Sequence, residues 1–124
     1  MRCKLPHAVQ IGPLQFNVVY KNKIKDPKEE SEIIWGQTYV EKREIEIGLI
    51  INRTREQCLS TLFHETLHAV IGTTGHSEIL NTANPGCEEA IVITFENYFA
   101  NAIDWKHPMW MNWKFVDIPQ EEYA

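Results

Sequence analysis

The feature that most limits the folds open to this chain is a change in the spacing of its apolar residues near the middle. Before about residue 48 apolar residues tend to alternate with polar ones, as in strands, and from Leu59 onward they recur every three or four residues, as in helices. Strands followed by helices are typical of α+β proteins. We therefore predict an α+β fold in which an N-terminal antiparallel β-sheet packs on helices from the second half.

Four strands are expected in the first half, over residues 8–11, 14–20, 33–40 and 43–47. Gly12 and Pro13 mark the turn between the first two. The polar residues 21–32 include a proline and show no periodicity, so we predict a loop there. Strict alternation over residues 43–47 predicts a strand with one face in water.

The first helix has clear start and stop signals. Thr54 followed three residues later by Gln57 resembles a capping box, in which each side chain bonds the other residue's backbone N–H. Apolar residues then continue with helical spacing from Leu59 until Gly72. We predict one amphipathic helix over this stretch.

A second helix is expected over about residues 85–103. Residues 73–83, rich in Thr, Gly, Ser and Asn, are predicted to be a loop, after which Asn84 and Pro85 supply a cap and a first-turn proline. An aromatic tail follows, and we expect it to pack on the core as a flap. This tail contains Met109, Trp110, Trp113 and Phe115.

Length, charge and cysteine usage narrow the class of protein. The 124 residues fit a single domain, 1–124, and the net charge of −5 argues against nucleic-acid binding. No run of eighteen apolar residues and no signal-peptide pattern is present, so no membrane association is expected. Three widely separated cysteines fit a reducing compartment. A cytoplasmic protein is the expectation.

The predicted first helix carries the sequence HETLH from His64 to His68. Histidines four residues apart lie one turn from each other on the same helix face, so both imidazoles can reach one metal ion. Glu65 lies beside that ion without binding it. The pattern predicts a Zn²⁺ site with His64 and His68 as ligands and Glu65 as the general base.

A catalytic zinc site needs a third protein ligand, and three residues compete for this role. Glu88 is preferred because it lies twenty residues after His68 and heads the apolar stripe of the second helix. Glu89 lies on a more polar line and is expected to be a solvated first-turn carboxylate. His76, eight residues after His68, follows a glycine turn and is the rival ligand. The stripe comprises Glu88, Val92, Phe95, Phe99 and Ala102.

Two further roles are needed for peptide hydrolysis. A donor must stabilise the oxyanion, and His76, Tyr39 and Tyr98 are the candidates. An extended peptide substrate must also be held, and an exposed edge strand can do this by backbone pairing. Residues 43–47 are predicted to be that edge strand because they precede the metal-binding helix.

These residues give the chain a resemblance to small zincin-like proteins, often encoded by phages and prophages and related in pattern to minimal gluzincins and the ImmA/IrrE peptidases. The resembling segments are residues 35–39, 45–47, 61–69 and 88–92. The resemblance implies a compact α+β domain with a twisted antiparallel sheet over the active-site helix and a second helix that donates a Glu ligand. It also implies zinc-dependent cleavage of a protein or peptide in the host cytosol.

The chain departs from that family at one position. Many gluzincins carry an Asp four residues after the ligand Glu, where it supports a zinc-bound histidine, whereas Val92 and Ile93 stand at this spacing after Glu88 and Glu89. The departure keeps a second hypothesis open, a zinc-stabilised binding, regulatory or virion-associated protein without turnover. Glu65 favours catalysis, because a purely structural zinc site needs no base.

Overall fold

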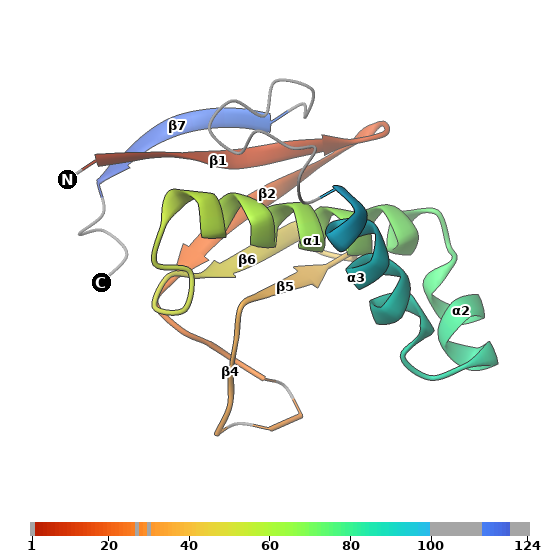
Figure 1. The fold of residues 1–124 in the computed structure, drawn as a ribbon. Helices are drawn as coiled ribbons and strands as arrows, with labels where there is room; N and C mark the ends of the chain where they lie inside the picture. The colour runs from red at the N-terminus through yellow and green to blue at the C-terminus, as the bar shows by residue number, and fades with distance from the viewer. Residues whose placement is uncertain (1, 27, 30, 100–112, 120–124) are drawn as a thin grey trace.

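The computed structural model describes residues 2–26, 28–29, 31–99 and 113–119, which form a sheet covered on one face by helices (Figure 1). The sheet has the strand order β5-β6-β2-β1-β7, and a separate two-stranded ribbon pairs β3 with β4. The strands are β1 (Arg2–Ile11), β2 (Leu14–Lys21), β3 (Ile24–Lys25), β4 (Ile33–Ile34), β5 (Gly36–Tyr39), β6 (Glu44–Gly48) and β7 (Trp113–Pro119). The helices are α1 (Arg55–Thr73), α2 (Ser77–Ala83) and α3 (Cys87–Phe99).

The sheet is mixed rather than antiparallel. β1 pairs antiparallel with β2 and β7, and β5 pairs antiparallel with β6, but β2 and β6 run parallel, from Asn17 opposite Glu44 to Lys21 opposite Gly48. The chain makes this parallel pair because it leaves the sheet after β2, forms the β3–β4 ribbon and returns through β5. The α+β class agrees with the prediction, and the wholly antiparallel sheet was wrong.

The edge of the sheet next to α1 is β5, not the predicted strand 43–47. β6 has hydrogen-bonded neighbours on both sides, so its backbone is not open to a peptide. The alternation placed the side chains on the correct faces, since Ile45 and Ile47 are fully buried in the core and Glu46 points to the other side. The predicted water-exposed face was wrong, because Glu46 is only 4% exposed and pairs with Lys21.

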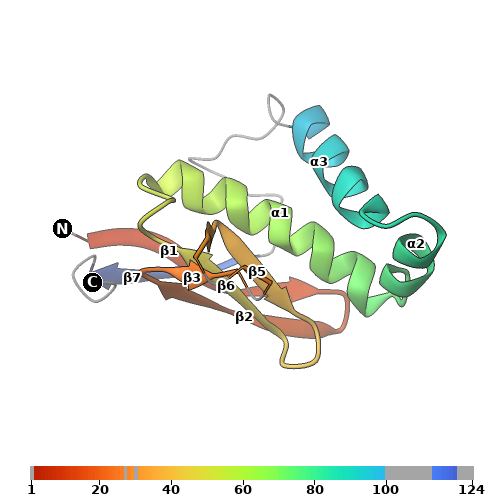
Figure 2. The same cartoon turned by 90° about the horizontal axis from the view of Figure 1, so that it is seen from below.

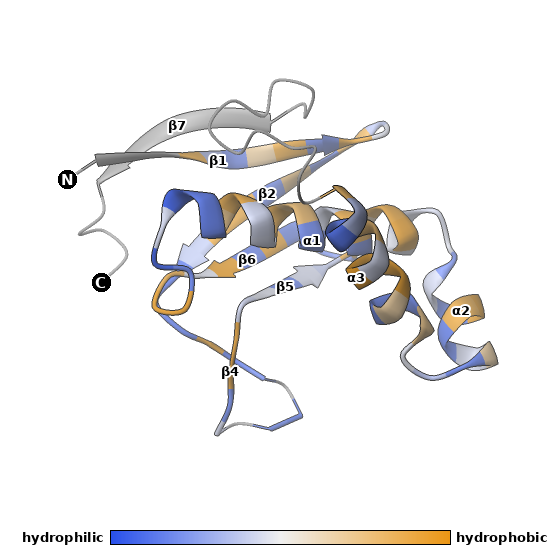
Figure 3. Ribbon diagram, in the orientation of Figure 1, coloured by the Kyte–Doolittle hydropathy of each residue, from blue (hydrophilic) through white to orange (hydrophobic). Residues whose placement is uncertain are grey.

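Helix α1 lies across one face of the sheet (Figure 2). Apolar side chains from both layers are buried together between them and form the core. Along α1 hydrophobic and hydrophilic residues alternate with the turns of the helix (Figure 3). Full burial of a Leu, Ile or Phe side chain contributes about 1.5–3 kcal/mol, so this layer accounts for the helix's placement. The cluster includes Leu5, Val9, Ile11, Phe16, Val18, Ile45, Ile47, Leu59, Leu62 and Ala69.

The ends of α1 follow from local sequence. The Thr54 hydroxyl accepts a hydrogen bond from the Gln57 backbone N–H, and the Gln57 side chain accepts one from the Thr54 N–H, which confirms the capping box. Near the other end, a Cβ on Gly72 would lie 2.6 Å from Val40 Cγ2. This glycine therefore lets the helix approach the chain that leaves β5.

The region after α1 differs from the prediction. The expected loop 73–83 contains the short helix α2, and α3 begins at Cys87 rather than Pro85. The end of the predicted second helix, residues 100–103, and the tail residues Met109 and Trp110 lie outside the described residues. Trp113 and Phe115 belong to β7, which pairs with β1. None of the described helices combines the length and apolarity needed to cross a bilayer.

Candidate metal centre

His64 and His68 lie on the face of α1 that turns toward α3, with ring centroids 5.0 Å apart. Their side chains are mostly buried, with 19% and 16% of the surface exposed. The predicted placement of both imidazoles on one helix face is confirmed.

Glu89, from the first turn of α3, lies across both imidazoles. Its Oε1 is 2.9 Å from His64 Nε2 and its Oε2 is 2.7 Å from His68 Nε2. One ligand atom from each of these three residues can be chosen so that all lie within 4.8 Å of one another. Two nitrogen donors and one carboxylate thus converge on a single point between α1 and α3.

The other nitrogen of each imidazole also faces a carboxylate. His68 Nδ1 is 2.5 Å from Glu88 Oε2, and His64 Nδ1 is 2.6 Å from Glu96 Oε2. Both nitrogens of each ring face a carboxylate, which only accepts, so a metal at the Nε2 atoms requires the Nδ1-protonated tautomer, in which Nδ1 donates to Glu88 or Glu96. Glu88 and Glu96 therefore orient the two rings and can accept the Nδ1 proton of each.

The structure brings Glu89, rather than the predicted Glu88, to the convergence point. The predicted apolar stripe is buried only in part, since Val92 is fully buried whereas Phe95 is 49% exposed. Val92 is the fully buried apolar residue of α3, and Phe99 at the end of that helix packs edge-on against Phe63 of α1. Glu88 and Glu89 precede Val92 by four and three residues. Both acids therefore flank the buried contact, one at each side of His68.

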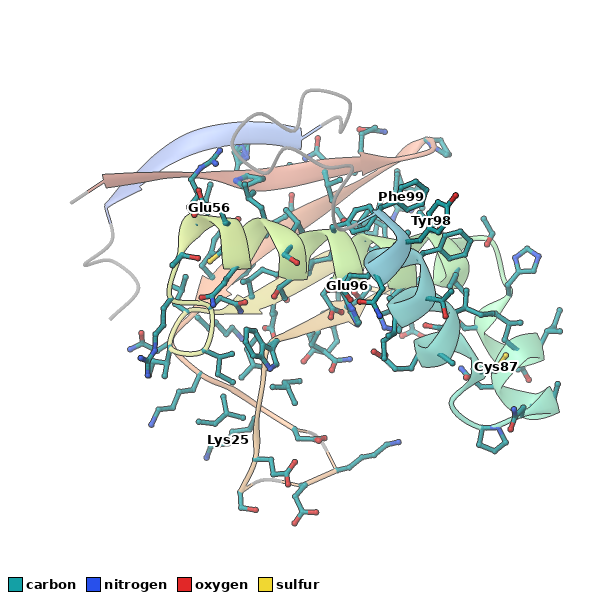
Figure 4. All side chains as sticks on the ribbon, viewed as in Figure 1. Lys25, Glu56, Cys87, Glu96, Tyr98 and Phe99 are labelled. Atoms are coloured by element: carbon teal, nitrogen blue, oxygen red, sulfur yellow. The ribbon has the colours of Figure 1, made fainter. Side chains whose placement is uncertain are left out.

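Glu96 was not singled out from the sequence. The spacing of α3 could have pointed to it, because Glu89, Val92 and Glu96 stand at i, i+3 and i+7 and therefore share one helix face. Two of these three residues are acidic, so the sequence alone does not indicate that this face packs against another helix. Figure 4 shows Glu96 on α3, beside α1.

Glu65 is buried at the side of the two histidines, with 7% of its surface exposed. Burial raises the pKa of its carboxyl group, opposed by a hydrogen bond from Thr38 and by nearby His68 and His64. Burial also lowers the pKa of His64, but the hydrogen bond to Glu96 and the surrounding carboxylates raise that pKa overall. The cluster therefore favours positive charge between its carboxylates.

The charge of the cluster fits a divalent cation. Glu65, Glu88, Glu89 and Glu96 bring up to four negative charges against at most two positive ones from the imidazoles. One of these oxygens, Glu88 Oε1, is buried with no hydrogen-bond partner among the described residues. Close carboxylates repel each other, and a metal ion relieves that repulsion. A donor set of two imidazoles and one carboxylate suits Zn²⁺ with an open position.

A cleft of about 870 Å³ opens beside His64 and Glu65. It extends along the N-terminal half of α1 to Gln57, roughly 12 Å at 1.5 Å per residue. Its opposite wall includes Ile34 and Trp35, and Trp35 is 52% exposed. The cleft therefore joins His64 and Glu65 to the start of the edge strand β5, where Gly36 and Gln37 line it.

The three predicted oxyanion donors are not among the described residues that line this cleft. His76 is exposed, with Nδ1 2.8 Å from the Thr74 hydroxyl, and it is not part of the convergent group either. Tyr98 is 80% exposed beside Phe99 (Figure 4). Tyr39 lies under the Lys42 ammonium, on the side of β5 away from α1.

No protein-family model, curated protein or solved structure matches this chain. What the cluster does is therefore argued from its own geometry and chemistry.

Proposed function

We propose that this chain is a zinc-dependent metallopeptidase of the zincin type. The observation that carries the proposal is the double set of carboxylates around the histidine pair: Glu89 at both Nε2 atoms, and Glu88 and Glu96 at the two Nδ1 atoms. Metal-binding histidines commonly have such a carboxylate at the far nitrogen. His64, His68 and Glu89 are the proposed ligands.

Each residue has a defined part in the proposed reaction. Zn²⁺ in this site supplies Lewis acidity, which lowers the pKa of a water molecule and polarises the substrate carbonyl. Glu65 accepts the proton of the attacking water and passes it to the leaving amine. Glu88 and Glu96 keep the imidazoles oriented throughout, a task that the missing Asp performs in many gluzincins.

The proposed substrate is an extended segment of a protein or peptide. β5 is the edge strand nearest the cleft, and no described strand pairs with its outer side, so its backbone can pair with such a segment. Ile34 and Trp35 offer apolar surface to a substrate side chain. The peptide-binding role first assigned to residues 43–47 therefore passes to β5. Cys58 and Cys87 carry thiols rather than a disulfide, the Cys58 thiol donating to the Asn52 backbone oxygen, and this accords with the proposed cytoplasmic setting.

The alternative is a zinc-stabilised binding protein without turnover. Glu65 argues against it, because a site that only stabilises the fold gains nothing from a buried carboxylate next to the open metal position. The cleft argues the same way, since it gives solvent and ligands access to Glu65.

The test compares wild type with Glu65→Gln and His64→Ala for zinc content and for cleavage of a library of extended peptides. Wild type should bind one zinc and cleave. Glu65→Gln should keep its zinc and lose about 100- to 10,000-fold in kcat, the usual contribution of a general base. His64→Ala should lose zinc. Glu56→Gln, an exposed glutamate on the same helix, is the matched control and should behave as wild type.

The outcomes separate the hypotheses. Zinc-loaded wild type that cleaves no peptide would reject the peptidase and support the binding protein. Wild type that binds no zinc would reject both.

A further inference from the structure

We propose that Thr38 is a positioning residue that holds the Glu65 carboxylate ready to accept a proton. This inference rests on the proposed function, because it assigns Glu65 the role of base. It makes the edge strand β5 responsible for orienting the base as well as for pairing with substrate.

The first support is a short contact between β5 and α1. Thr38 Oγ1 lies 2.8 Å from Glu65 Oε1 and 3.0 Å from the Glu65 backbone oxygen. The ionised carboxylate and the backbone oxygen both only accept, so the hydroxyl donates its single hydrogen, and the carboxylate oxygen is the nearer of its two acceptors. Because this bond occupies Oε1, the other oxygen, Oε2, is available to a water molecule in the cleft.

The second support is the space that β5 leaves for Glu65. Gly36 precedes Thr38 by two residues and therefore faces the same side of the strand. A Cβ at Gly36 would lie 3.0 Å from Glu65 Cγ and 2.9 Å from Thr61 Cγ2. Gly36 thus leaves space for the Glu65 methylene groups, and Thr38, the next residue on the same side of the strand, binds the Glu65 carboxylate.

The third support is the position of β5 at the edge of the sheet. On one side it pairs with β6, where Gly36 lies opposite Ile47 and Thr38 opposite Ile45. No other described strand pairs with its outer side. A peptide that pairs with this outer side would therefore lie against the same strand that carries Thr38.

The experiment compares the zinc-loaded full chain with its Thr38→Val, Thr38→Ala and Thr38→Ser variants, measuring kcat, KM, zinc content and Tm. Thr38→Val keeps the side-chain shape without the hydroxyl, and kcat should fall about 10- to 100-fold, as for a misplaced catalytic group, with KM and zinc content unchanged. Thr38→Ala should show the same loss, and it replaces Thr38→Val should that variant not fold. Thr38→Ser should recover most of kcat.

Thr94→Val is the matched control, because the Thr94 hydroxyl bonds a backbone oxygen on the exposed side of α3. It should leave kcat unchanged. A Thr38→Val enzyme with wild-type kcat would overturn the inference. Equal losses in the Ser and Val variants, with lowered Tm in both, would also overturn it by assigning Thr38 a packing role.

A second measurement does not depend on activity. Crystal structures of zinc-loaded wild type and Thr38→Val should show the Glu65 carboxylate in one orientation in the first and in more than one in the second. An unchanged Glu65 in the variant would contradict the inference. If wild type orders Glu65 through Thr38 but cleaves nothing, the proposed function fails while the contact stands.

Discussion

The two faces of α1 are held in different ways. Toward the sheet, Leu59, Leu62 and Ala69 are fully buried among apolar side chains. Toward α3, the contacts are dominated by two histidines and by carboxylates, with Val92 as the fully buried apolar contribution of α3. The first face needs nothing but burial to be stable, whereas the second gathers like charges that repel. We infer that the sheet and α1 form the metal-independent frame and that the docking of α3 depends on the ion.

The largest effect is expected from a substitution on the face of α1 that packs against the sheet. Leu62→Ala should destabilise the protein by about 2–5 kcal/mol, because it removes buried methyl groups and leaves a cavity. Urea unfolding measures this loss. The affinity of the remaining folded molecules for zinc should stay at the wild-type value, and a matching loss of zinc affinity would show that the two faces are not separate.

Removal of zinc tests whether the docking of α3 on α1 depends on the ion. A chelator should lower the free energy of unfolding by about 2.7 kcal/mol if the free zinc was at 100 times its Kd. Local loosening should be confined to one region: amide hydrogen exchange should accelerate in α3 and stay slow in β1, β2 and β6. Uniform acceleration across the sheet and α3 would contradict a metal-independent frame.

The smallest expected effect comes from the carboxylates at the Nδ1 atoms. Glu88→Gln and Glu96→Gln should each weaken zinc binding about 10- to 100-fold, since the amide still accepts the imidazole proton but lacks the charge that favours it there. Competition with a zinc-binding dye gives the affinities, with Glu78→Gln on α2 as the exposed control. If Glu88→Gln instead abolished zinc binding as His64→Ala does, Glu88 would be a ligand.

The sequence predicts the first helix and its histidine pair because both depend on neighbours along the chain. The cap joins Thr54 to Gln57, and helical periodicity alone puts His64 and His68 on one face. The third ligand could not be chosen this way. Adjacent residues differ by about 100° around a helix, so whether Glu88 or Glu89 reaches the ion depends on how α3 is rotated, which is set by its tertiary contact with α1.

In the sheet, too, the sequence predicts what depends on neighbouring residues and not what depends on tertiary contacts. Alternation gave the correct faces for Ile45 and Glu46, because each strand residue's side follows from its neighbours. It did not give the order or direction of strands, which depend on contacts between distant segments. Residues 33–40 were predicted as one strand, but the chain bends at Trp35, between β4 and the edge strand β5. There the Trp35 carbonyl accepts hydrogen bonds from the Gly48 N–H and the Asn52 side chain.

The most direct test of the central claim is a crystal structure of the zinc-loaded protein with anomalous data collected at the zinc edge. The account predicts one zinc ion about 2.0–2.2 Å from His64 Nε2, His68 Nε2 and a Glu89 oxygen. Glu88 and Glu96 should remain on the Nδ1 atoms. An ion bound by Glu88 in place of Glu89, an ion at another site, or no anomalous peak between α1 and α3 would contradict it.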